Sequence, residues 1–176
     1  MPKFILDGIE IEFTQGQTII EAAAAHGIDI PHFCWHPSLS VSGNCRMCLV
    51  EIEKMPKLMI ACSTVAAEGM VVHTQSPKTI EARNAVMEFI LINHPLDCPI
   101  CDEAGECKLQ DYAYKYSTGI SRFTEDKVHK PKRVELGPHV ILDVERCIMC
   151  SRCIRFSEEI AGQKALTFTE RGTHVV

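Results

Sequence analysis

The sequence lacks several features that would indicate common functions. No Gly-x-Gly occurs in its 176 residues, and neither the dinucleotide-binding fingerprint nor a phosphate-binding P-loop is present. The net charge of −5 offers no basic face for nucleic acid. The most apolar stretch, residues 86–92, is far too short to span a membrane. No pair of carboxylates has the pattern of acid–base machinery, so we expect no catalytic residue in this chain.

Cysteine, in contrast, is abundant, with ten residues. Disulfide frameworks are typical of small secreted domains, but this sequence opens at once on a strand-like segment, residues 3–6, and we expect no signal segment before it. The cysteines form successive groups of four, three and three, and the repeated C-x2-C spacing suits metal ligation better than disulfides. We interpret the groups as a row of metal sites.

The first group occupies residues 31–62 and contains Cys34, Cys45, Cys48 and Cys62. Four cysteines are the number that both two-iron and four-iron clusters require. Structural zinc is the alternative, but zinc sites usually have two tight pairs and this group has one. Gly43, just before the tight pair, allows the backbone to approach a cluster closely.

The second group contains Cys98, Cys101 and Cys107, which is one ligand short of four. His94 precedes Cys98 by four residues and would complete the set. A histidine at the end of a helix is more often a C-terminal cap, so the missing fourth cysteine is what favours His94 as a ligand. Asp97 is the rival oxygen ligand.

The third group is Cys147, Cys150 and Cys153, in the C-x2-C-x2-C pattern of a four-iron site. Two-cluster ferredoxins place a further cysteine four residues later, where this chain has Ser157. No cysteine follows Cys153. The fourth ligand would therefore come from beyond residue 176, from another chain or from His174, and we favour a continuation of the chain.

Hydrophobic patterns predict the elements that carry these groups. A hairpin around Asp7-Gly8 and a helix with a Thr18–Glu21 capping box predict the opening of a ferredoxin-like β-grasp. The other predicted strands are residues 48–53, 57–62, 70–74, 139–143, 165–170 and 173–176, and the other predicted helices are residues 77–93, 109–116 and 150–161. Residues 117–136 are expected to be irregular, with a solvated basic run at 127–133.

The segments CWHPSLSVSGNCRMCLVEIE, NHPLDCPICDEAGECKLQDYAY and ERCIMCSRCIRFSEEIAGQKALTFTERG resemble the N-terminal iron–sulfur part of the large subunit of NADH–quinone oxidoreductase, respiratory complex I. The resemblance implies a [2Fe–2S] cluster on the first group, a His94-ligated [4Fe–4S] cluster on the second and another [4Fe–4S] cluster on the third with a later cysteine. The resemblance implies that the family's large subunit continues into a molybdopterin-oxidoreductase-like domain, so we expect this sequence to be either part of a longer chain or a shortened version.

The implied fold class is α+β, with three parts in order. A [2Fe–2S] β-grasp domain at 1–77 is followed by a small helical [4Fe–4S] domain at 78–117, ligated by one histidine and three cysteines, and by the start of a bacterial-ferredoxin-like [4Fe–4S] domain at 118–176. The implied function is electron transfer from an NADH- and FMN-binding flavoprotein subunit towards quinone, beside other peripheral-arm subunits, with no membrane span of its own. The implied location is the cytoplasmic side of the bacterial inner membrane.

Two other functions are kept as alternatives. The first is an electron-input module of an iron-only or NAD-linked hydrogenase or of an NAD-dependent formate dehydrogenase. Such relatives commonly carry a cysteine where this chain has Ser157, so the residues around Ser157 favour complex I. The second alternative is a zinc-stabilised interaction module without a redox role.

Overall fold

The computed structural model describes residues 1–176, which form two compact units, residues 1–86 and 87–176. Its elements are β1 (Lys3–Leu6), β2 (Ile9–Glu12), α1 (Ile19–Ala25), β3 (Leu49–Ile52), β4 (Met59–Ile60), β5 (Val71–His73), α2 (Pro77–Asn93), the short 3-10 helix η1 (Cys98–Ile100), α3 (Lys108–Tyr116), β6 (Val134–Glu135), β7 (Ile141–Leu142), α4 (Arg152–Arg155), the π-helix η2 (Phe156–Ile160) and the 3-10 helix η3 (Gly172–His174). None of the helices combines the length and hydrophobicity needed to cross a bilayer. The predicted three-part division of the chain stays a prediction.

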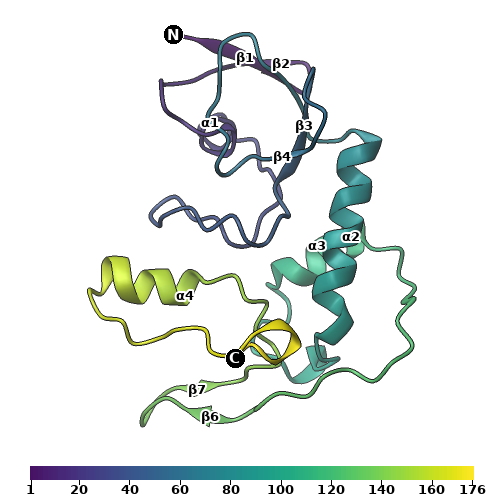
Figure 1. Ribbon diagram of the computed structural model, residues 1–176, viewed down its shortest axis with the longest axis vertical. Coiled ribbons are helices and arrows are strands. Elements are labelled where there is room, and N and C mark those ends of the chain that lie inside the picture. The colour runs from purple at the N-terminus through teal and green to yellow at the C-terminus, as the bar shows by residue number, and fades with distance from the viewer. The chain divides into compact units, whose positions relative to one another are not determined.

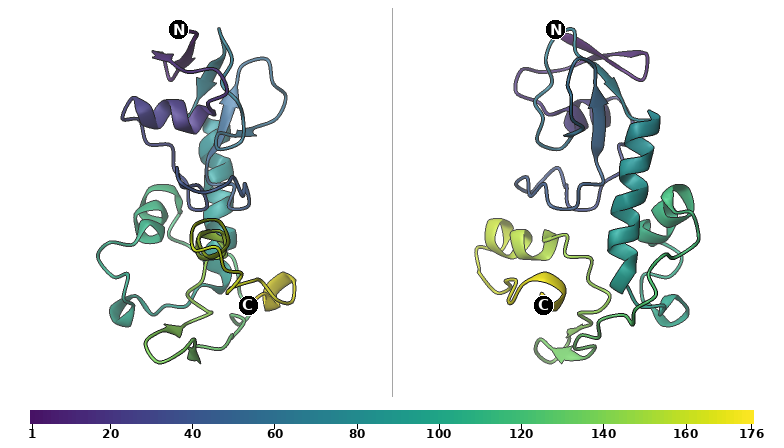
Figure 2. Two further views of the ribbon diagram at one scale, coloured as in Figure 1. Left: turned by 90° about the vertical axis from the view of Figure 1, so that its left-hand side faces the viewer. Right: turned by 45° about the vertical axis from the view of Figure 1, so that its right-hand side comes forward.

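The first unit is a five-stranded sheet in the order β2-β1-β5-β3-β4, with α1 beside it (Figures 1 and 2). β1 and β5 are parallel, and the other neighbouring strands are antiparallel. The β1–β2 hairpin turns at Asp7 and Gly8, whose positive φ angles of 48° and 85° are those a two-residue type I′ turn needs. The predicted hairpin is therefore confirmed.

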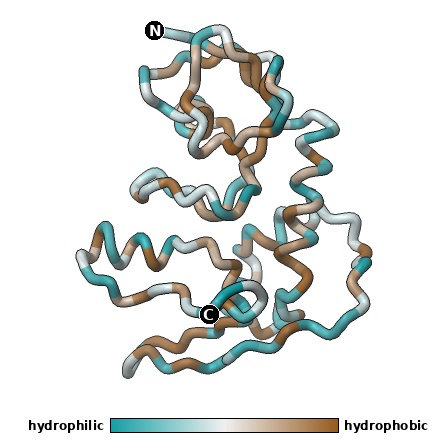
Figure 3. Tube along the Cα trace, in the orientation of Figure 1, coloured by the Kyte–Doolittle hydropathy of each residue, from teal (hydrophilic) through white to brown (hydrophobic).

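Helix α1 begins as the sequence predicts. The Glu21 amide donates to the Thr18 side chain, and the Glu21 carboxylate accepts from the Thr18 amide at 2.8 Å. Its buried face joins the strands in one apolar core, and Figure 3 shows hydrophobic stretches along the strands of this unit. The core residues are Phe4, Leu6, Ile11, Phe13, Ile19, Ile20, Ala22, Ala23, Ile30, Trp35, Cys48, Val50, Ile52, Ala61, Cys62, Ala66 and Val72.

The second unit has little regular structure. Its helix α3 covers the predicted residues 109–116 and buries Tyr112 and Tyr116, whose ring centroids lie 6.2 Å apart. The predicted strand at 139–143 shrinks to the two residues of β7, which pair with β6. β6 lies inside the segment expected to be irregular, so that expectation was wrong at Val134–Glu135.

The predicted strands at 165–170 and 173–176 are also wrong. Only one pair of residues, Thr169 and Val176, exchanges backbone hydrogen bonds, at 2.9 and 3.2 Å, and η3 occupies the residues between. A strand needs a neighbouring strand over several residues to satisfy its backbone, and this stretch finds none. The helix predicted for 150–161 is present as α4 continued by η2.

Candidate metal centres

Cys34, Cys45 and Cys48 lie on the long segment between α1 and β3, Cys62 follows β4, and each of the four thiols contacts at least one other. Cys34, Cys48 and Cys62 are buried, and Cys45 is half-buried. Thiol hydrogen bonds from Cys45 and Cys62 lower the pKa of Cys34 to about 2, and one from Cys62 lowers the pKa of Cys48. The same contacts raise the pKa of Cys45 and Cys62. The order of contact is therefore Cys45, Cys34, Cys62, Cys48.

Backbone groups around these thiols favour their negatively charged form. The Cys34 amide donates to Cys45 Sγ at 3.4 Å, and backbone hydrogen bonds from Asn44 and Met47 also lower thiol pKa values. Arg46, between the two cysteines of the tight pair, has a left-handed φ of 60°. Loops with such residues direct amide groups towards anionic clusters. Four adjoining thiols with amide donors fit an anionic iron–sulfur cluster.

Gly43 lies close to a neighbouring side chain, and its predicted approach to a cluster stays a prediction. Its φ is +65°, and a Cβ there would lie 3.1 Å from Ile60 Cδ1. Any side chain at residue 43 would strain the backbone and press on β4, which precedes Cys62. Glycine therefore lets the loop pass close to the strand.

The second group is arranged on the ends of short helices. Cys98 begins η1, Cys101 follows it and donates its amide to the Cys98 carbonyl at 3.3 Å, and Cys107 precedes α3. His94 follows the last residue of α2 and is half-buried. Burial lowers the pKa of His94, helped by the positive charge of Lys127. The neutral imidazole that results is the form that binds metals.

His94 could instead cap α2, and Asp97 could instead be a ligand, but other side chains make the contacts that these two roles need. Lys127 Nζ donates to the carbonyls of Leu91 and Ile92, at 2.9 and 2.8 Å, and so caps the end of α2. The Asp97 carboxylate pairs with Lys132 and Arg146, and the Lys132 ammonium holds the pKa of Asp97 below its usual value. A capping histidine and an aspartate ligand are both less favoured by these contacts.

The third group is carried by a tight loop and the first turn of α4. Met149 and Ser151, which lie between the cysteines, have left-handed φ angles of 56° and 60°. The Met149 amide donates to Cys147 Sγ at 3.4 Å. Burial raises the pKa of the Cys147 thiol. Like the loop around Arg46, this loop has left-handed residues between its cysteines and an amide that donates to a thiol.

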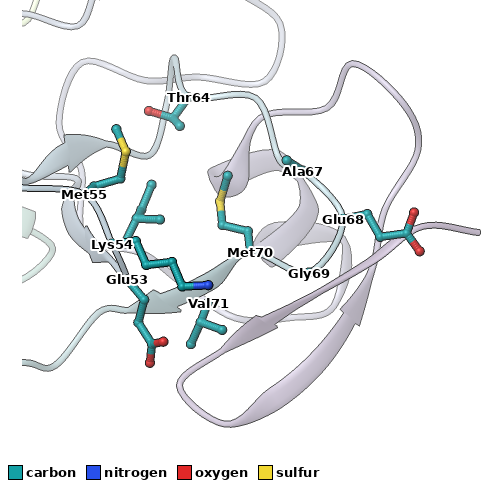
Figure 4. A pocket seen from close by; sticks show the side chains of 10 residues that line it. Glu53, Lys54, Met55, Thr64, Ala67, Glu68, Gly69, Met70 and Val71 are labelled. Atoms are coloured by element: carbon teal, nitrogen blue, oxygen red, sulfur yellow. The ribbon is translucent and has the colours of Figure 1, made fainter.

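No group of three or more His, Cys, Asp or Glu side chains converges on a point where a single metal ion could be held. A separate depression of about 320 Å³ lies in the first unit, where Figure 4 shows Met55 and Met70 among its lining side chains. None of the candidate ligands lines it.

Three family models match the chain in order. Residues 2–77 match a 2Fe-2S iron-sulfur cluster binding domain, residues 83–122 the NADH-ubiquinone oxidoreductase-G iron-sulfur binding region, and residues 137–176 the ferredoxin-like domain of NADH-quinone oxidoreductase subunit 3. The G subunit of the NADH-quinone oxidoreductase of Rickettsia conorii is 50% identical over 99% of this chain. The chain belongs to the G-subunit family of NADH-quinone oxidoreductases. The predicted complement of one [2Fe–2S] and two [4Fe–4S] clusters fits the three matched domains.

A mitochondrial relative is similar to the chain to nearly the same extent. The mitochondrial NADH dehydrogenase [ubiquinone] iron-sulfur protein 1 of Solanum tuberosum is 47% identical over 97% of this chain. The chain spans about a quarter of these relatives, 26% of the Rickettsia protein and 23% of the potato protein. Among solved structures, a chain of an NAD+-reducing [NiFe]-hydrogenase aligns with a TM-score of 0.82 and 32% identity, over 99% of this chain and 73% of that one.

Ser157 is a structural residue in this member of the family. It is buried, its hydroxyl donates to the Gln163 carbonyl, and it accepts from the Ala165 amide at 3.1 Å. The side chain therefore ties η2 to the chain that follows it. A cysteine would make both hydrogen bonds poorly, because a thiol is a weak donor and acceptor.

Several residues near the proposed ligands were not predicted from the sequence. The basic run at 127–133 was expected to be solvated, yet Lys127 caps α2, Lys130 Nζ donates to the Val175 carbonyl at 2.6 Å and Lys132 pairs with Asp97. The buried Arg83 was missed too. Its spacing of four residues from Thr79 and from Met87, both buried, is the signal that places it on the inner face of α2.

Proposed function

We propose that this chain transfers single electrons through three iron–sulfur clusters within an NADH–quinone oxidoreductase. One observation carries the proposal: all ten cysteines and His94 fall into three sets, one inside each matched iron–sulfur region. The identity of 50% to the Rickettsia protein over almost the whole chain supports the same function. Electrons would arrive from an NADH- and flavin-bearing partner and leave towards quinone.

The proposed ligands are the cysteines of the three groups and His94. The [2Fe–2S] cluster is bound by Cys34, Cys45, Cys48 and Cys62, the first [4Fe–4S] cluster by His94, Cys98, Cys101 and Cys107, and the second by Cys147, Cys150 and Cys153. The fourth ligand of the last cluster is not a cysteine of this sequence. Asp97 and His174 are not included.

The clusters, when bound, take up and release electrons without bond-making at the protein. The protein's share is to bind and surround them. Buried cysteines such as Cys48 and Cys62 keep water from the first site, and amide donors such as that of Cys34 stabilise negative charge on sulfur. The lowered pKa of His94 favours its neutral, ligating form at neutral pH.

The proposed partners are the flavoprotein subunit and other peripheral-arm subunits. The proposed place is the cytoplasmic side of the bacterial inner membrane, where the complex holds the chain at the periphery. This assignment follows from the function of the whole oxidoreductase, of which the chain would be one part.

The test has two parts. The chain purified without oxygen should contain iron and acid-labile sulfide, and its reduced form should give one two-iron and at least one four-iron signal in electron paramagnetic resonance. A colourless protein loaded with zinc would contradict the proposal. The second part is purification from its own cells, which should yield flavoprotein and membrane-bound quinone-reducing subunits with it.

A second candidate function is electron input to an NAD-linked hydrogenase. The observation that favours it is the aligned hydrogenase chain, with its TM-score of 0.82. The lower identity, 32% against 50%, makes it the weaker candidate. Co-purification of a hydrogenase catalytic subunit, in place of quinone-reducing subunits, would establish it.

A further inference from the structure

Arg83, in the first half of α2, is a fully buried cation with 0% of its surface exposed. Its guanidinium donates to three backbone carbonyls. Nε donates to Met47 at 3.2 Å, Nη1 to Thr74 at 2.7 Å and Nη2 to Leu49 at 3.0 Å. Burying a charge is costly unless it is hydrogen-bonded, and these three hydrogen bonds offset that cost.

Two of the three acceptors lie on either side of Cys48. Met47 and Leu49 are its neighbours in sequence, and Cys48 itself is 1% exposed. Arg83 therefore hydrogen-bonds to the backbone immediately before and after a proposed cluster ligand. These two hydrogen bonds hold the backbone on both sides of Cys48.

The third acceptor connects the same guanidinium to the sheet. Thr74 follows β5, and its amide donates to the Asp7 carboxylate at the β1–β2 turn at 2.7 Å. Arg83 thus joins the tight cysteine pair, the end of β5 and α2 through one planar group. It lies outside residues 2–77, the part of the chain that matches the [2Fe–2S] domain.

We propose that Arg83 is a positioning residue of the [2Fe–2S] site, which holds the Cys48 segment in place and supplies a buried positive charge to the cluster. The proposal rests on the assignment of Cys48 as a ligand under the proposed function. A fixed cation stabilises the reduced cluster, which carries one more negative charge than the oxidised cluster. Arg83 should therefore raise the reduction potential of the site and slow the loss of its iron.

The chemistry of arginine separates these two effects. Its rigid fork reaches several acceptors at once, whereas a lysine ammonium is a point charge on a flexible stem. R83K keeps the charge but loses the simultaneous hydrogen bonds to three carbonyls. R83M removes the charge and keeps most of the volume. K78M is the matched control, because Lys78 is a cation on the same helix that donates to a backbone carbonyl, that of Pro56 at 3.2 Å, away from the cysteines.

The experiment is a redox titration of the full chain, followed by electron paramagnetic resonance, with the four-iron signals as internal reference. At a fixed poise, R83M should lower the ratio of reduced to oxidised two-iron cluster by on the order of tenfold, a shift of about 59 mV for one electron. R83K should return the potential towards that of the unaltered chain. It should, however, release the iron of the two-iron cluster to a chelator several-fold faster. K78M should change neither quantity.

The outcomes divide cleanly. If the unaltered chain shows no two-iron signal, the ligand assignment fails and the proposed function fails with it. If that signal is present and both R83K and R83M leave its potential and its rate of iron loss unchanged, Arg83 is only a packing residue. If R83M does not fold, R83K decides: iron loss at the unaltered rate overturns the proposal, and faster loss with intact four-iron signals supports it.

Discussion

Arg146 and Asp97 form an ion pair, with 3.3 Å between Nη2 and Oδ2. Asp97 immediately precedes Cys98 and Arg146 immediately precedes Cys147, so this pair joins the loops of two different cysteine groups. Arg146 Nε also lies 3.1 Å from the Asp143 carboxylate. The two proposed four-iron sites therefore share a charged contact within the second unit.

Replacing Arg146 with methionine should affect both four-iron sites and spare the two-iron site. Loss of the cation removes a favourable interaction with negatively charged clusters, so we expect lower reduction potentials for the four-iron signals. R146K should restore part of the shift. Redox titration measures each signal separately, and R133M, at an exposed arginine with no ion pair, is the control. Equal effects of R133M and R146M would contradict the prediction.

Substitution should distinguish the role of His94 as a ligand from the role of Lys127 as a helix cap. H94A should remove or convert one four-iron signal and leave the two-iron signal in place, because the imidazole is the proposed fourth ligand. K127M should weaken the end of α2, whose carbonyls it caps, while both four-iron signals remain. Electron paramagnetic resonance and circular dichroism of the reduced chain measure the two effects. Survival of every signal in H94A would rule out ligation by His94.

Removing the metal should loosen the first unit. Cys34, Cys48 and Cys62 are buried, and Cys62 contacts both of the others, so without iron the site keeps a cluster of buried thiols that no ligand holds together. Because ligand binding and folding are coupled, C45S or an iron chelator should lower the midpoint of thermal unfolding of this unit. The four-iron signals in C45S are the control. An unchanged midpoint would show that the apolar core alone sets its stability.

The Thr18 capping box should contribute measurably to the same unit. T18A removes the side chain that accepts from the Glu21 amide, and we expect a loss of about 1 kcal/mol in the free energy of unfolding. Denaturant titration of the holo-chain measures it. T14A is the matched control, since Thr14 is an exposed threonine just before the same helix. A similar loss in both variants would contradict a specific capping effect.

Ser157 should matter through its two backbone contacts. S157A leaves the Ala165 amide and the Gln163 carbonyl without their partner, which should cost about 1–3 kcal/mol where water does not replace it. Hydrogen exchange is the sharpest measurement, because protection of the Ala165 amide should fall first. T167A, at an exposed threonine in the same stretch, should leave that protection unchanged.

The sequence predicted those elements whose signals are local. The turn at Asp7-Gly8, the cap at Thr18 and the proline at the start of α2 each act over a few residues, and all are present. The predicted strands 165–170 and 173–176 failed because a strand depends on a distant neighbour that the pattern does not reveal. Apolar alternation alone indicated a strand there, and the chain forms a turn held by one residue pair.

The cysteine groups were visible in the sequence because metal ligands keep fixed spacings. The residues around them were not, because their partners are far away along the chain. Arg83 reaches carbonyls 34 and 36 residues before it, and Lys132 reaches a carboxylate 35 residues before it. Such contacts depend on the tertiary fold, and a basic run such as 127–133 looks the same whether it is solvated or internally paired.

The ion pairs of the second unit have a consequence for its response to salt. Lys132 is paired with Asp97 and with Glu145, at 2.9 Å from the latter, and the Lys132 side chain is 45% exposed. Charged groups at such partly exposed positions are screened as ionic strength rises, whereas burial of apolar surface is not weakened in this way. The stability of the apolar core in the first unit and that of the charge network in the second should therefore respond differently to added salt. Rising ionic strength would loosen the surroundings of the four-iron sites while the β-grasp keeps its shape.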